Sequence, residues 1–79
     1  MMNETEMARV VSRAIDGYFR DLDGEKASGV YDMVIGSVEK PLLESVLHKV
    51  RGNQSHAAAM LGINRNTLHK KIKTYNIKF

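Results

Sequence analysis

The chain has 79 residues and a formal net charge of +3, which leaves room for one small domain with a limited hydrophobic core. Because it has no cysteine and its three histidines are scattered, we expect neither disulfides nor a structural metal. No apolar stretch approaches the roughly 20 residues that cross a bilayer, so we expect a cytoplasmic protein without cofactor, membrane contact or small-molecule substrate.

The net charge conceals a strong asymmetry along the chain. Residues 1–45 contain five basic and nine acidic side chains, whereas residues 46–79 contain seven basic side chains and no acid. The corresponding net charges are −4 and +7. A basic surface of this kind can be a merely solvated face, but it also suits a polyanion, and we predict a nucleic-acid partner.

Residues 4–21 are predicted to form the first helix. Asn3 and Glu6 fit a capping box at its start, and residues 21–24 supply the exit turn. Apolar side chains recur every three or four residues and form one broad stripe, which contains Met7, Val10, Val11, Ala14, Ile15, Tyr18, Phe19 and Leu22.

A second helix of about 21 residues is predicted between Ser28 and Val50, where the apolar period continues until residues 51–53 break it. Pro41 lacks the N–H that would bond to the carbonyl of Ser37. We expect a kink rather than a break there, because the apolar period carries through the proline.

The first two helices present more apolar surface than they can bury against each other. The simplest remedy is symmetric pairing of two chains. We therefore predict an all-α fold, an intertwined homodimer whose first two helices form a four-helix core. Core or interface packing is the expected role of Tyr18, Phe19, Tyr31 and Met33.

Residues 53–75 carry the pattern of a helix-turn-helix. Asn53 can cap a short helix over residues 54–61, Gly62 suits a tight turn, and Asn64 can cap a last helix. Ala57 and Ala58 permit close approach of the two helices, and Ile63 can fill the angle between them. The expected organisation is one domain, residues 1–79, with dimerisation helices in residues 4–51 and the helix-turn-helix in residues 53–75.

The last helix is predicted to be amphipathic. Its apolar face holds Leu68, Ile72 and Tyr75. The opposite face is polar and basic, with Asn66, His69, Lys70 and Lys73, and Lys71 flanks it. One face is expected to pack on the core, and the other to meet solvent or DNA.

Base contacts are predicted at the start of this helix, which in a helix-turn-helix enters the major groove. The candidates are Asn64 and Arg65, followed by Asn66 and Thr67. Arg65 can bond both O6 and N7 of guanine, although it can also be a solvated arginine. Asn64 can cap the helix, contact a base or do both.

Phosphate contacts position a protein on DNA without reading its sequence. Phosphate contacts are expected from side chains on the last helix and at the start of the helix before it. Asn53 can add a phosphate contact to its capping role, and His56 and His69 can join when protonated. The remaining candidates are Gln54, Ser55, Lys70, Lys71 and Lys73.

Two segments resemble the Fis family, the factor for inversion stimulation: residues 51–58 (RGNQSHAA) and 62–73 (GINRNTLHKKIK). The resemblance continues upstream through Tyr18, Phe19, Leu22, Tyr31 and residues 39–43 (EKPLL), and it covers nearly the whole chain. It implies a nucleoid-associated homodimer of four helices per chain that binds and bends double-stranded DNA and regulates transcription.

By the family pattern, Asn64 and Arg65 approach bases. The same pattern assigns backbone contacts to Asn53, Gln54, Ser55, Thr67, Lys70 and Lys71. The chain departs from the family at His56, at Asn66, which replaces a glycine, and at His69, where arginine is common. Little sequence precedes the first helix, so we expect bending and regulation without the invertase stimulation that mobile N-terminal arms provide.

Two alternatives remain open. One is a dimeric helical module whose basic face binds an acidic protein or an RNA. The other is an isolated DNA-binding domain of an NtrC-type activator, whose C-terminal helix-turn-helix is similar. An enzyme is not expected, because the basic half has no acid, the chain has no cysteine, and no glycine-rich phosphate loop is visible.

Overall fold

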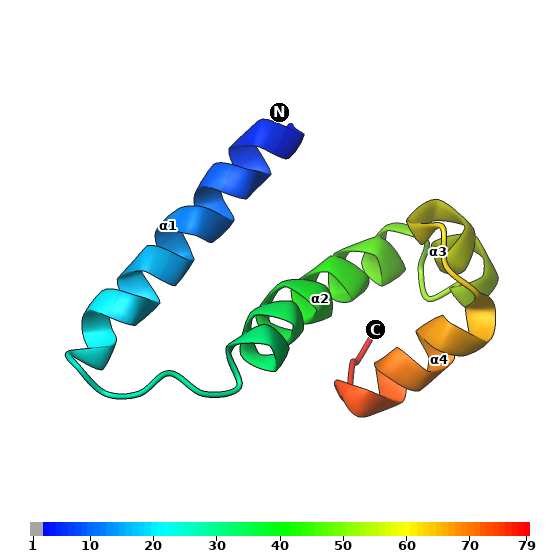
Figure 1. The fold of residues 1–79 in the computed structure, drawn as a ribbon. Coiled ribbons are helices and arrows are strands. Elements are labelled where there is room, and N and C mark those ends of the chain that lie inside the picture. Colours follow the sequence, from blue (N-terminus) through cyan, green and yellow to red (C-terminus); the bar gives the residue numbers. More distant parts are fainter. Residues whose placement is uncertain (1–2) are drawn as a thin grey trace. The chain divides into compact units, whose positions relative to one another are not determined.

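The computed structural model describes residues 3–79, which contain four helices and no strand (Figure 1). The helices are α1 (Glu4–Leu22), α2 (Val30–Lys49), α3 (Gln54–Leu61) and α4 (Arg65–Thr74). They confirm the predicted all-α fold, and their ends lie within the one or two residues by which helix boundaries ordinarily vary. In this part of the chain, no helix is both long enough and apolar enough to span a membrane.

The chain divides into two compact units, one ending at Val30 and the other running from Tyr31 to Phe79. In the first unit, the side chain of Asn3 accepts a hydrogen bond of 2.9 Å from the backbone N–H of Glu6, which confirms the predicted N-cap of α1. Asp23 ends α1 in the left-handed conformation, with φ of 48°. Tyr18 and Phe19 meet edge to face at a centroid distance of 5.6 Å.

The second unit contains the buried core. Helices α2, α3 and α4 each contribute two residues to it, and one more follows the end of α4: Leu43, Leu47, Ala57, Ala58, Leu68, Ile72 and Ile77. The helical period did not predict Ile77, because the residue lies beyond the last helix. Its backbone N–H donates to the carbonyl of Ile72 at 3.0 Å, which turns the chain back onto the core.

Helix α2 continues through Pro41 without a break, as predicted. Two of its faces differ in their surroundings. Leu43 and Leu47 are buried in the core of the second unit. A neighbouring stripe at helical spacing is exposed and apolar, and it consists of Tyr31, Ile35, Val38 and Leu42.

The junction between α2 and α3 is a tight left-handed turn. Arg51 and Gly52 have φ of 54° and 80°, and the N–H of Gly52 donates to the carbonyl of Leu47 at 2.9 Å. The ring of Phe79 lies over the turn, so that a Cβ on Gly52 would come within 2.9 Å of its Cδ2 atom. Glycine is therefore favoured here by the backbone conformation, and a Cβ would also make the ring of Phe79 shift.

Candidate nucleic-acid interface

Helix α3 starts and packs as its sequence predicts. The side chain of Asn53 accepts a hydrogen bond of 3.1 Å from the backbone N–H of His56, which caps the helix. Ala57 and Ala58 are buried, and their small side chains allow α3 and α4 to approach each other. Asn53 and Ser55 remain exposed at the start of α3, where its unpaired N–H groups can meet an anion.

The turn between α3 and α4 confirms the roles predicted for three residues. Gly62 has φ of 74°, and its N–H donates to the carbonyl of Ala58 at 2.9 Å. Ile63 is half-buried against the core. Asn64 caps α4 by accepting a hydrogen bond of 2.7 Å from the N–H of Asn66. This bond uses the carbonyl oxygen of the Asn64 amide, so its NH₂ group can still donate to a ligand.

Helix α4 has the amphipathic arrangement predicted for it. Leu68 is 0% exposed and Ile72 is 9% exposed, so this face packs on the core. The side chains predicted for the outer face are all exposed, together with two neighbours at the start of the helix: Arg65, Asn66, Thr67, His69, Lys70 and Lys73. A face of this kind presents donors and positive charge to the solvent, with no acid from residues 46–79.

A shallow hollow of about 300 Å³ lies between the start of α3 and the outer face of α4. It is lined by Gln54, Arg65, Asn66 and His69, so it brings together residues that the sequence suggested separately. Nδ1 of His69 lies 3.3 Å from Oε1 of Gln54, and it donates to that oxygen in the Nδ1–H tautomer. This contact joins the two helices at the surface predicted to face DNA.

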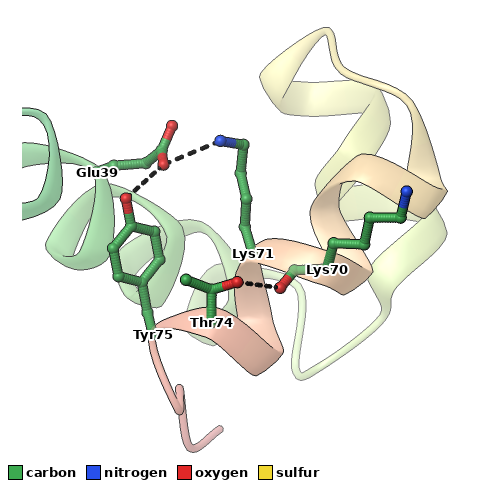
Figure 2. A network of polar contacts seen from close by, with 5 residues as sticks. All are labelled: Glu39, Lys70, Lys71, Thr74 and Tyr75. Atoms are coloured by element: carbon green, nitrogen blue, oxygen red, sulfur yellow. Dashed lines mark hydrogen bonds and ion pairs between the residues drawn. The ribbon is translucent and has the colours of Figure 1, made fainter. Parts of the chain in front are cut away.

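Among the predicted backbone contacts, Lys71 forms an ion pair with an acidic side chain of another helix. Its Nζ lies 3.0 Å from Oε1 of Glu39 on α2, and the hydroxyl of Tyr75 donates to the same oxygen at 2.7 Å. In Figure 2 the side chain of Lys71 points toward Glu39, whereas that of Lys70 points away from it. Only one of these adjacent lysines is thus turned to the outer face.

The network shifts the acidities of two of its members. The hydrogen bond from Tyr75, and then that from Lys71, lower the pKa of Glu39 below its ordinary 4.5. The hydrogen bond to Glu39 raises the pKa of Tyr75 above 10.0. Sequence reasoning missed Glu39 because it lies 32 residues before Lys71. One signal was present in the sequence: Glu39 lies four residues before Leu43, so the two share a face of the predicted helix.

Comparisons with known proteins show what the chain is similar to. A family model described as bacterial regulatory protein, Fis family, matches residues 35–75, which include most of α2 and the whole helix-turn-helix. A protein of Ralstonia nicotianae named Fis-like DNA-binding protein is 49% identical over 76 residues, which cover 96% of this chain and 99% of that protein. The similarity therefore extends through α1 as well as through the helix-turn-helix.

Proposed function

This chain belongs to the Fis family of bacterial regulatory proteins, and we propose from that premise that it is a nucleoid-associated transcription regulator that bends duplex DNA as a homodimer. The chain is a DNA-binding helix-turn-helix protein. The observation that carries the proposal is α4, which is capped by Asn64, packed by Leu68 and Ile72, and polar and basic on its outer face. Such a helix fits the major groove.

Arg65 is the proposed base-reading residue. It lies in the first turn of α4 and is exposed, and its guanidinium can donate two hydrogen bonds to the O6 and N7 atoms of one guanine. Asn64 is proposed to add a base contact through the NH₂ group that its capping bond does not use. Each well-formed bidentate pair contributes about 1 to 3 kcal/mol of discrimination between bases.

The backbone contacts are proposed to come from the surfaces on either side of the hollow. At the start of α3, the contacting residues are Asn53, Gln54 and Ser55. On α4 they are Thr67, His69, Lys70, Lys71 and Lys73, and Nζ of Lys71 keeps N–H donors for a phosphate while it stays bonded to Glu39. Such contacts release counterions, so that affinity falls steeply as salt is added.

Homodimer formation is supported by apolar surface that the single chain leaves exposed. On α1, the exposed fractions of Met7, Val10 and Phe19 are 52%, 50% and 49%. On α2, the stripe from Tyr31 to Leu42 is exposed as well. Apolar faces of this kind on two long helices mark an interaction surface, and a second copy of the chain offers the matching faces.

Bending follows from the proposed dimer. Two recognition helices joined through one rigid core lie at a set distance, and the family resemblance implies a distance shorter than one turn of straight B-DNA. The duplex must then deform to meet both helices, at a cost of order 1 to 6 kcal/mol that depends on its sequence. Selection of DNA sites would therefore depend on deformability as well as on Arg65.

The test combines affinity, salt dependence and bending on one duplex. We expect the logarithm of the binding constant to fall with the logarithm of salt concentration with a slope of about six or more. Arg65→Ala should weaken the preferred site by about 1 to 3 kcal/mol and leave non-specific binding less affected. Lys26→Ala, an exposed change between α1 and α2, is the matched control.

Three outcomes would contradict the proposal. The first is a wild-type protein that neither retards nor bends duplex DNA. The second is a duplex affinity that Arg65→Ala and Lys70→Ala together leave unchanged. The third is equal competition by an RNA duplex, which would favour the RNA-binding alternative. Sedimentation equilibrium checks the dimer separately, through a mass twice the 8.9 kDa of one chain.

A further inference from the structure

Glu39 holds the C-terminal end of α4 at two points (Figure 2). Its Oε1 atom accepts hydrogen bonds from Nζ of Lys71 at 3.0 Å and from the hydroxyl of Tyr75 at 2.7 Å. Because Lys71 and Tyr75 are four residues apart, they lie one helical turn apart on the same side of the helix. Both bonds involve the charged carboxylate, which makes them stronger than bonds between neutral groups.

The ring of Tyr75 lies close to Gly36 of α2. A Cβ added to Gly36 would lie 3.7 Å from Cε1 of Tyr75, which is ordinary van der Waals contact. Gly36 and Glu39 are one turn apart on α2, so the ring lies along that helix and its hydroxyl meets Glu39. The side chain of Glu39 is only 23% exposed, so its bonds are partly shielded from water.

The bonds to Glu39 add a directional restraint at the C-terminal end of α4. Leu68 and Ile72 pack the helix on the core, and the two hydrogen bonds fix its end through their own geometry. From Arg65 to Thr74 the helix rises roughly 14 Å, so a tilt of about 10° moves one end by roughly 2 Å relative to the other. A dimer doubles this displacement, because symmetry repeats it in the partner.

We propose that Glu39 is a positioning residue for the DNA complex: by holding Lys71 and Tyr75 it sets the tilt of α4 on α2, and thereby the angle by which the dimer bends DNA. The inference rests on the proposed function, since a bend angle exists only for a protein that binds the duplex. Glu39 itself does not touch DNA in this account. Its neighbours Val38 and Leu42 belong to the exposed stripe of α2, so it lies between the proposed dimer face and the recognition helix.

The experiment measures the bend angle by energy transfer between dyes at the two ends of a duplex, with full-length protein at saturation. Saturation removes any effect of affinity or of a smaller folded fraction, so that the readout reports geometry. Glu39→Met keeps the length of the side chain and removes both acceptor atoms. Tyr75→Phe removes only the hydroxyl, and Glu39→Gln keeps an acceptor oxygen without the charge.

We expect Glu39→Met to change the bend angle by at least about 10°, within the range that smooth bending of a short duplex allows. Tyr75→Phe should change the angle in the same direction by a smaller amount, and Glu39→Gln should lie closest to wild type. Glu44→Met is the matched control, because it removes the same charge from the same helix. We expect it to leave the bend angle unchanged.

The outcomes separate this inference from the function on which it rests. A wild-type protein that does not bend DNA would contradict the proposed function. A wild-type protein that bends DNA, with Glu39→Met at the same angle, would overturn the role of Glu39 and leave the function intact. An equal change in Glu44→Met would also overturn it, because loss of a negative charge on α2 would then explain the change in bend angle. If circular dichroism shows that Glu39→Met is unfolded, Tyr75→Phe decides, and an unchanged angle overturns the inference.

Discussion

Helices α1 and α4 are both capped and amphipathic, yet only α4 has its apolar face buried within its own unit. Leu68 and Ile72 of α4 are buried in the core of the second unit. On α1, by contrast, Phe19 and Val10 are about half exposed, and the residues whose burial the structure describes include none that is buried. The spacing of apolar residues thus predicts which face of a helix is apolar, but not what covers it.

The difference has an energetic consequence. Isolated helices of fewer than about 12 to 15 residues are marginal in water, so the ten residues of α4 depend on the core of their own chain. The 19 residues of α1 are longer, but their apolar stripe is stabilised only when another surface covers it. We therefore expect substitutions in α4 to affect folding of the chain, and those in α1 to affect association.

Leu68→Ala should have the largest effect. Removal of a fully buried leucine side chain leaves a cavity and should lower the free energy of unfolding by about 2 to 5 kcal/mol, measured by urea denaturation. Met60→Ala, at a position 53% exposed on α3, is the control and should change stability by less than about 0.5 kcal/mol. Equal losses of stability in the two variants would contradict the dependence of α4 on the core.

Phe19→Ala tests whether the apolar face of α1 takes part in association. If a partner chain covers this ring, its loss should weaken association by about 1.5 to 3 kcal/mol per protomer, measured by sedimentation equilibrium over a range of concentrations. Arg13→Ala, an exposed change on the same helix, should leave association unaltered. An unchanged dimer constant for Phe19→Ala would mean that the apolar face of α1 has another role.

Gly52→Ala tests the turn between α2 and α3 in the second unit. A side chain in the left-handed region costs about 1 to 2 kcal/mol, and here its Cβ would also collide with Phe79. Thermal unfolding of Gly52→Ala should show a smaller loss when Phe79→Ala is present, because only the backbone cost remains. A loss of the same size in both backgrounds would show that Phe79 does not constrain the turn.

The pH dependence of Glu39→Gln should show the smallest effect. The lowered pKa of Glu39 means that its contribution to stability is present above pH 4.5 and is lost as the pH falls through its folded-state pKa. The raised pKa of Tyr75 means that its contribution is present below pH 10.0 and is lost as the pH rises further. The difference between wild type and variant in urea melts should therefore shrink at both extremes, and a difference independent of pH would contradict the network.

The parts of the fold that depend on neighbouring residues were predictable from the sequence. Helix periodicity predicted α1, α2 and α4, whereas a capping residue, small residues and a glycine turn predicted α3. The caps at Asn3, Asn53 and Asn64 were predicted as well, and each bonds to a backbone N–H two or three positions away. The turn at Gly62 was predictable as well, because glycine adopts the positive φ that a tight turn needs. The base and phosphate contacts remain predictions, since they depend on a partner.

Other features depend on residues that are distant in sequence. Ile77 belongs to the core although no helical period extends to it, and Phe79 lies over Gly52 through the same return of the chain. The hollow beside α4 forms only because Gln54 of α3 is brought beside Arg65 and His69. No local pattern reports such approaches.

Lys71 shows the difference between what the local sequence determines and what tertiary packing determines. Local residues establish that it lies on a basic helix at the edge of its apolar face, because periodicity assigns each side chain a direction from the helix axis. Whether its ammonium meets a phosphate or a carboxylate depends on what lies across from that edge. The packing of α4 on α2 places Glu39 there, from 32 residues earlier in the chain. Tertiary structure alone decides that pairing, because it depends on how two helices pack and not on the residues within either one.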